Sequence, residues 1–181
     1  MQNRRVTSSD PTPLQRRLVL MRHAKAEAWG EDDHARALTE KGRTAAAAAG
    51  RWLADRGFVP DHALVSSATR TRQTWEELSA AAGWGLTPVF EDALFAASPE
   101  NALDLLREAP ETAVSLIAIG HNPTIAFLAQ LLDDGSGDVE ASSAMVGDYP
   151  TSTLAVYGFD GEWADLDLAS ASLQAFRRGA S

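Results

Sequence analysis

Two of the four histidines stand just after short apolar runs that are typical of strands covered on both faces. His23 comes two residues after the run at 18–21, and His121 comes two residues after the run at 114–119. In open α/β sheets, ligands bind beyond the carboxyl ends of the strands. The placement of these two imidazoles therefore predicts a reactive site at one edge of a sheet.

Two arginines belong to the same predicted edge. Arg22 directly precedes His23, and Arg70 begins the helix that is expected after a third short strand at 63–65. A guanidinium holds phosphate oxygens in pairs, and the backbone amides of a helix that opens near Asn122 would add anion affinity. Together these groups predict a phosphate pocket.

The chain of 181 residues carries 16 Lys and Arg against 25 Asp and Glu, which gives a net charge of -9. This sign excludes an extended nucleic-acid footprint. The charge is uneven, because residues 16–25 and 66–74 contain basic side chains and no acids, whereas residues 133–167 contain acids and no Lys or Arg. An electropositive cleft can therefore coexist with an anionic surface.

The absence of cysteine excludes disulfides, thiolate nucleophiles and iron–sulfur clusters. The nucleophile must then be a histidine, a serine, a threonine or a carboxylate. Imidazole suits the chemistry best, because it is substantially neutral near pH 7 and attacks phosphorus without an auxiliary base. One histidine would attack, while the other and the arginines would neutralise the transferred group.

Strands and amphipathic helices alternate along the chain, which predicts a three-layer α/β/α sandwich with a mostly parallel central sheet. A flexible lead-in is expected at 1–15 and a single domain at 16–181. Thr39, Ser98 and Asn122 are the predicted helix caps, and Gly57 and Gly83 the predicted helix stops. The expected strands are 18–21, 63–65, 89–90, 114–119, 154–157 and 166–169, and the expected helices begin after 39 and cover 69–82, 99–108 and 124–132.

The longest strongly apolar run, residues 113–119, is far too short to span a bilayer. No apolar stretch follows Arg4 and Arg5 that could form the core of a signal peptide. We therefore expect a cytoplasmic protein with neither a membrane nor a nucleic acid as partner.

Several segments resemble the histidine phosphatase superfamily, which has the phosphoglycerate-mutase-like fold. They are Arg22-His23-Ala24, the stretch 66–74 that contains Arg70, and Gly120-His121-Asn122-Pro123. The segments 36–42 and 149–151 are also similar to the small SixA-type branch, the phosphohistidine phosphatases.

The resemblance implies that His23 is the nucleophile, that Arg22 and Arg70 clamp the phosphate, and that His121 contacts the phosphoryl group. It also implies that the loop of Arg36 borders the site. Asn122 would join the substrate-binding residues through the helix start. A covalent phosphohistidine intermediate that water hydrolyses to inorganic phosphate, without a metal or an organic cofactor, is further implied.

The sequence departs from the family at one point. Members that act on alkyl phosphates usually add a carboxylic acid that protonates the leaving oxygen, whereas Ala96 occupies this position here. Only Glu91 and Asp92 lie upstream, and neither fits the spacing well. This favours phosphohistidine in proteins or another activated phosphate as the substrate. A broad phosphomonoesterase acting on small metabolites and a non-catalytic phospho-ligand module are the alternatives.

Other residues keep two interpretations. His34 ends an acidic run, 31–34, which either binds a divalent metal or is simply solvated. Arg72 faces either the pocket or solvent, and the five tryptophans are expected in the core or in a lid. A dinucleotide site and a serine hydrolase lack their glycine motifs.

Overall fold

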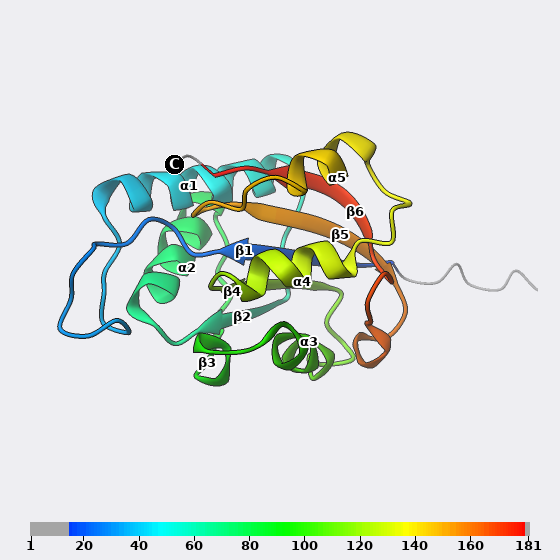
Figure 1. Ribbon diagram of the computed structural model, residues 1–181, viewed down its shortest axis with the longest axis horizontal. Helices are drawn as coiled ribbons and strands as arrows, with labels where there is room; N and C mark the ends of the chain where they lie inside the picture. The colour runs from blue at the N-terminus through cyan, green and yellow to red at the C-terminus, as the bar shows by residue number, and fades with distance from the viewer. Residues whose placement is uncertain (1–14, 180–181) are drawn as a thin grey trace, which may run out of the picture.

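The computed structural model describes residues 15–179, and in them six strands form one mixed sheet (Figure 1). The strand order is β3-β2-β4-β1-β5-β6. Neighbours are parallel from β3 to β1, whereas β5 is antiparallel to both β1 and β6. The strands are β1 (Gln15–Arg22), β2 (His62–Ser66), β3 (Val89–Glu91), β4 (Ser115–Gly120), β5 (Leu154–Asp160) and β6 (Ser172–Arg177).

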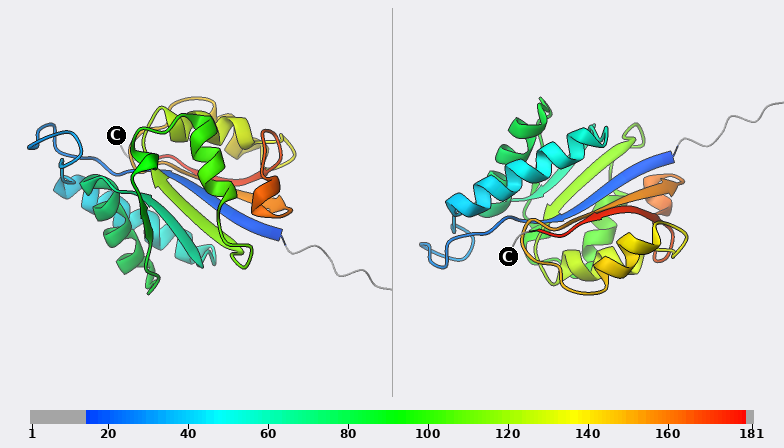
Figure 2. Two further views of the ribbon diagram at one scale, coloured as in Figure 1. Left: turned by 90° about the horizontal axis from the view of Figure 1, so that it is seen from below. Right: turned by 90° about the horizontal axis from the view of Figure 1, so that it is seen from above.

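Helices cover both faces of the sheet, which confirms the predicted three-layer α/β/α fold (Figure 2). One face carries α1 (Glu40–Asp55) and α2 (Thr69–Ala82). The other carries α3 (Pro99–Arg107), α4 (Thr124–Leu132) and α5 (Val139–Met145). Two short 3-10 turns, η1 (Ala93–Phe95) and η2 (Trp163–Asp165), complete the set.

The strand β1 shows why its apolar run is continuous. Leu18 and Leu20 point into the core beneath α3, α4 and α5, whereas Val19 and Met21 point into the core beneath α1 and α2. All four side chains are fully buried. A strand that is covered on both faces needs apolar side chains in both directions, so alternation disappears from its sequence.

The predicted helix boundaries rest on local hydrogen bonds. Thr39 Oγ1 accepts a hydrogen bond from Gly42 N at 3.0 Å, and Ser98 caps α3 in the same manner. Gly57 and Gly83 adopt left-handed φ values of 64° and 73° just beyond α1 and α2, as predicted. These features confirm the predicted starts of α1 and α3 and the predicted ends of α1 and α2.

The helix α1 packs closely on α2. Ala46, Ala49, Gly50 and Leu53 are buried, while Ala45 and Trp52 are half-buried. A Cβ on Gly50 would stand only 2.1 Å from the carbonyl oxygen of Leu78 in α2. The glycine therefore sets the contact between the two helices.

Two predictions near the carboxyl terminus were wrong. Residues 166–169, expected as a strand, form a turn in which Asp167 and Ser170 bond to each other, and the strand is β6 instead. The helix α5 was missed; the side chain of Asp138 caps it by accepting a hydrogen bond from Ala141 N. Short polar segments of this kind satisfy a turn and a helix cap equally well.

The predicted lead-in at 1–15 lies outside the described residues except for Gln15, which already belongs to β1.

Of the tryptophans, Trp163 is fully buried and donates a hydrogen bond from its indole nitrogen to Ala113 O, whereas Trp29 is 89% exposed. No helix within residues 15–179 combines the length and apolarity that a bilayer crossing requires.

Candidate active site

The two histidines meet because β1 and β4 are parallel neighbours that end together. Arg22 is paired with Gly120 in the sheet, and His23 N donates to Gly120 O at 3.0 Å. The next residue along each chain segment is then a histidine, and the ring centroids of His23 and His121 are 5.2 Å apart. Figure 1 shows β1 running toward this edge of the sheet.

The tautomer of His23 is fixed by its own backbone. Its Nδ1 lies 2.7 Å from the carbonyl oxygen of Ala24. Because a carbonyl oxygen only accepts, Nδ1 carries the proton and Nε2 keeps its lone pair. The side chain is 8% exposed. Burial lowers its pKa to about 4, the hydrogen bond that Nδ1 donates to the Ala24 carbonyl opposes this shift, and the charges of Arg70 and Arg22 lower the pKa further. His23 is thus a neutral imidazole at pH 7 with a free Nε2.

His121 is also neutral at pH 7. Burial lowers its pKa to about 3, and the charges of His23 and Arg70 act in the same direction. Its Nε2 lies 2.7 Å from Ser66 Oγ, while its Nδ1 is buried and has no hydrogen-bond partner among residues 15–179. Ser66 ends β2, and its contact with His121 was not predicted from the sequence.

The two arginines are held by backbone groups and keep donors free. Arg70, which is 5% exposed, donates to Asp33 O at 2.6 Å and to the Asp33 carboxylate at 3.2 Å. Arg22 donates through Nη1 to Tyr149 O at 2.9 Å. Burial lowers the pKa of both guanidiniums. The Nε atoms of both are buried without a partner among residues 15–179.

Buried polar atoms normally find partners, so these free groups require an explanation. Three of these atoms lie at one edge of the sheet: Arg22 Nε at the end of β1, His121 Nδ1 just after β4, and Arg70 Nε at the start of α2. The cationic charges act on His23, since both arginines lower its pKa. A phosphoryl group beside His23 would accept hydrogen bonds from the two guanidinium Nε atoms, and from His121 Nδ1 in the tautomer that carries its proton there.

Asn122 does not cap α4, which was the predicted role; α4 begins after Pro123 without a side-chain cap. Instead, Asn122 Nδ2 donates to Tyr149 O at 2.9 Å, the same carbonyl that receives Arg22. Its Oδ1 is buried and unpartnered within residues 15–179. Asn122 therefore helps to hold the segment that orients Arg22.

Arg36 borders the site through its charge, which lowers the pKa of His23. It donates to Asp33 Oδ1 at 2.9 Å and to Glu27 O at 2.9 Å. Arg72, in contrast, donates to the backbone and lies over the ring of Phe90, with its Cζ 4.0 Å from the ring centroid. Arg72 is therefore a helix-surface residue on the β3 side.

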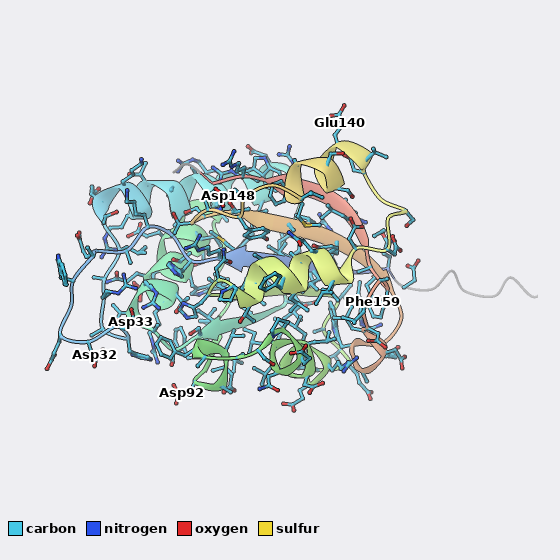
Figure 3. The ribbon with its side chains drawn as sticks, viewed as in Figure 1. Asp32, Asp33, Asp92, Glu140, Asp148 and Phe159 are labelled. Carbon is cyan, nitrogen blue, oxygen red and sulfur yellow. The ribbon has the colours of Figure 1, made fainter. Side chains whose placement is uncertain are left out.

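The acidic run at 31–34 forms ion pairs with arginines. The Asp33 carboxylate pairs with both Arg36 and Arg70, and Figure 3 shows Asp33 beside the beginning of α2. Within residues 15–179 no cluster of three or more His, Asp or Glu is arranged to hold a metal ion. His34 instead contacts Ser67 and Phe95, which the sequence did not indicate.

Within residues 15–179, neither Glu91 nor Asp92, the two acids upstream of Ala96, is hydrogen-bonded to the histidine pair. The Glu91 carboxylate accepts a hydrogen bond from Ala93 N at 2.9 Å. Asp92 is exposed and lies at the outer surface (Figure 3). In their place Phe95 packs over His121, with ring centroids 5.3 Å apart.

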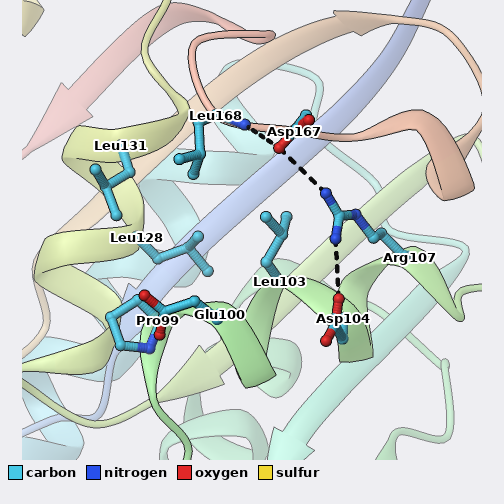
Figure 4. A pocket seen from close by; sticks show the side chains of 9 residues that line it. All are labelled: Pro99, Glu100, Leu103, Asp104, Arg107, Leu128, Leu131, Asp167 and Leu168. Atoms are coloured by element: carbon cyan, nitrogen blue, oxygen red, sulfur yellow. Dashed lines mark hydrogen bonds and ion pairs between the residues drawn. The ribbon is translucent and has the colours of Figure 1, made fainter.

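A cavity of about 310 Å³ lies elsewhere, between α3, α4 and the turn at Asp167 and Leu168 (Figure 4). Leucines line it, and Arg107 beside it is paired with Asp104 and Asp167. Neither histidine of the reactive pair lines this cavity.

Comparison with known proteins agrees with this geometry. The model of the histidine phosphatase superfamily (branch 1) matches residues 18–96, which include His23 and Arg70. An uncharacterised protein of Mycobacterium tuberculosis H37Rv is 34% identical over 158 residues, which cover 86% of this chain and 98% of the relative.

Two solved structures, both assigned as SixA phosphohistidine phosphatases, are also similar. The one from Nakamurella multipartitia is 34% identical, with a TM-score of 0.80 and coverage of 94% of this chain and 100% of its own. The one from Agrobacterium tumefaciens is 33% identical, with a TM-score of 0.72 and coverage of 90% and 97%. This chain therefore belongs to the histidine phosphatase superfamily and, within it, is of the SixA type, which makes it a phosphatase.

Proposed function

We propose that this phosphatase removes the phosphoryl group from phosphohistidine in proteins, or from another activated phosphate, through a phosphohistidine on His23. One observation carries the proposal. His23, with its unprotonated Nε2, lies at the same sheet edge as Arg22 Nε, Arg70 Nε and His121 Nδ1, three buried atoms without a partner within residues 15–179. A neutral nucleophile among unsatisfied donors suits a dianionic phosphoryl group.

In the first step, Nε2 of His23 attacks phosphorus and the bond from phosphorus to the leaving group breaks. The charge of the phosphoryl group spreads over its oxygens in the transition state, where Arg22, Arg70 and His121 neutralise it. The Ala24 carbonyl holds the Nδ1 proton of His23 and stabilises the ring as it becomes cationic.

In the second step, water attacks phosphorus and the bond between phosphorus and Nε2 breaks. Inorganic phosphate leaves, and His23 returns to its neutral form. The same donors serve both steps, because the phosphoryl group moves only a short way, first from the leaving group to Nε2 and then from Nε2 to water.

The surroundings of the pair support an activated phosphate as substrate. Within residues 15–179, the Glu91 carboxylate accepts a hydrogen bond from a backbone amide, the Asp33 carboxylate pairs with Arg36 and Arg70, and Phe95 packs against His121, so no carboxyl group is hydrogen-bonded to the pair. An alkoxide needs a strong proton donor to leave, whereas an imidazole leaves more readily. Phosphohistidine, with an imidazole as its leaving group, therefore fits this site better than a sugar phosphate does.

Replacing His23 tests the nucleophile. We expect His23→Ala to lower turnover by about 10³-fold or more and to abolish acid-labile phosphate on the protein. Vanadate binding should persist in part, because the arginines remain. Chelators should leave the wild-type rate unchanged, because the guanidiniums of Arg22 and Arg70 supply the required positive charge. Undiminished hydrolysis by the variant would refute the assignment.

A comparison of substrates tests the preference for an activated phosphate. We expect kcat/KM on a phosphohistidine peptide to exceed that on a sugar phosphate and on a phosphoserine peptide by at least about 10²-fold, which is the usual contribution of a missing acid. Equal efficiency on all three substrates would favour a broad phosphomonoesterase instead.

A further inference from the structure

A histidine without a role in the mechanism above lies close to the reactive pair. The Nε2 of His34 is 3.0 Å from Ser67 Oγ, and its ring centroid is 5.0 Å from that of Phe95. Phe95 in turn packs on His121 at 5.3 Å. The two histidines also interact electrostatically, because the charge of His34 helps to lower the pKa of His121. His34 therefore lies close to His121, and Phe95 contacts the rings of both histidines.

The loop of His34 is fastened to the start of α2. Thr69 N donates to His34 O at 3.0 Å, and Arg70 Nη1 donates to the neighbouring Asp33 O at 2.6 Å. These bonds hold the backbone of the loop at His34, and the hydrogen bond to Ser67 holds the imidazole ring. The bond to Ser67 uses Nε2 and leaves Nδ1 as the nitrogen that can exchange a proton with a bound substrate.

An imidazole leaving group needs a weaker acid than an alkoxide does, but it still needs a proton. A leaving imidazole departs as a neutral molecule only when its other ring nitrogen is protonated, because the imidazole anion is strongly basic. The carboxylates near this edge are not placed to supply the proton, since Glu91 bonds to Ala93 N and Asp33 bonds to two arginines. An imidazole exchanges protons near neutral pH, so it matches an imidazole leaving group well.

We propose that His34 is the proton donor to the leaving group and the proton acceptor for the attacking water. In the first step, the bond between His23 Nε2 and phosphorus forms, the bond to the leaving nitrogen breaks, and the leaving imidazole keeps the proton that His34 has given. In the second step, neutral His34 takes a proton from water as the oxygen of that water attacks phosphorus. His34 thereby regains the proton that it gave in the first step. This inference rests on the proposed function.

The test compares two leaving groups in single-turnover experiments that follow phosphorylation of His23. The variant His34→Gln retains an amide that can bond to Ser67 but cannot donate a proton as an acid. With a phosphohistidine peptide, we expect the variant to be slower by about 10²-fold. With para-nitrophenyl phosphate, whose phenolate leaves without a proton, we expect a loss of no more than about threefold.

A loss of the same size with both substrates, or no loss with either, would overturn the proposal. The matched control, Ser67→Ala, keeps the imidazole and removes its hydrogen bond, and should show a smaller loss with the same dependence on the leaving group. His34→Asn repeats the test with a shorter amide, and vanadate binding reports that each variant retains the pocket. If wild-type protein forms no acid-labile phosphate on His23, the proposed function itself fails, whatever the two substrates show.

Discussion

Lowering the pH from 7 to 5 should destabilise the fold through its two buried histidines, His23 and His121. The pKa of His23 falls from 6.5 to about 4 on folding, and that of His121 falls to about 3. The unfolded chain therefore takes up protons first as the pH drops below 6.5, and stability is lost progressively down to the pKa of each histidine in the folded protein.

The size of this effect follows from the pKa values. At pH 5 an unfolded histidine is largely protonated, whereas His23 in the folded protein is mostly neutral. This difference costs about 2 kcal/mol between pH 7 and pH 5, and His121 contributes about the same. Contributions of carboxylates to the pH dependence cancel when the wild type is compared with variants.

The assay is urea unfolding of the wild type, His23→Asn, His121→Asn and the double variant at both pH values. Each single variant should lose about 2 kcal/mol less than the wild type, and the double variant about 4 kcal/mol less. The buffer must contain no phosphate or sulfate, because a bound anion stabilises the folded state by mass action. An independent NMR titration should place the midpoint of the His23 ring near 4.

The reasoning is refuted if the single variants show the same pH dependence as the wild type. It is also refuted if the ring of His23 titrates near 6.5. Either result would mean that burial and the neighbouring guanidiniums do not keep the nucleophile neutral.

Three further substitutions probe the pocket and the packing that supports it. Arg70→Ala should weaken vanadate binding by about 10- to 100-fold, measured by calorimetry, because one charged set of donors is lost. Gly50→Ala should lower the free energy of unfolding by roughly 2–3 kcal/mol, because its Cβ would meet Leu78 O at 2.1 Å; Gly85→Ala, with nothing within 4 Å, is the matched control. Tyr149→Phe should cost about 1–2 kcal/mol in urea unfolding, because the buried hydroxyl loses its hydrogen bond of 2.9 Å to the carbonyl oxygen of Leu20.

The sequence by itself determined the α/β class, most helix ends and the approximate position of the reactive edge. Continuous apolar runs specify strands that are buried on both faces, and the capping side chains of Thr39 and Ser98 act within three residues of themselves. These signals are local, so they can be read without knowing the rest of the fold. The pairing of His23 with His121 follows from the same logic, because both stand just past the ends of parallel strands.

Only the tertiary structure decided which polar groups meet. The bonds from Asn122 to Tyr149 O, from Ser66 to His121 and from Ser67 to His34 join residues 27 to 55 positions apart. A polar side chain has many alternative partners of similar energy, and strand order and loop path select among them. The same holds for α5 and β6, whose short patterns suit several structures until packing against the sheet selects one. The proposed proton donor, His34, therefore had no signature in the sequence, because its position depends on a loop fastened to a distant helix.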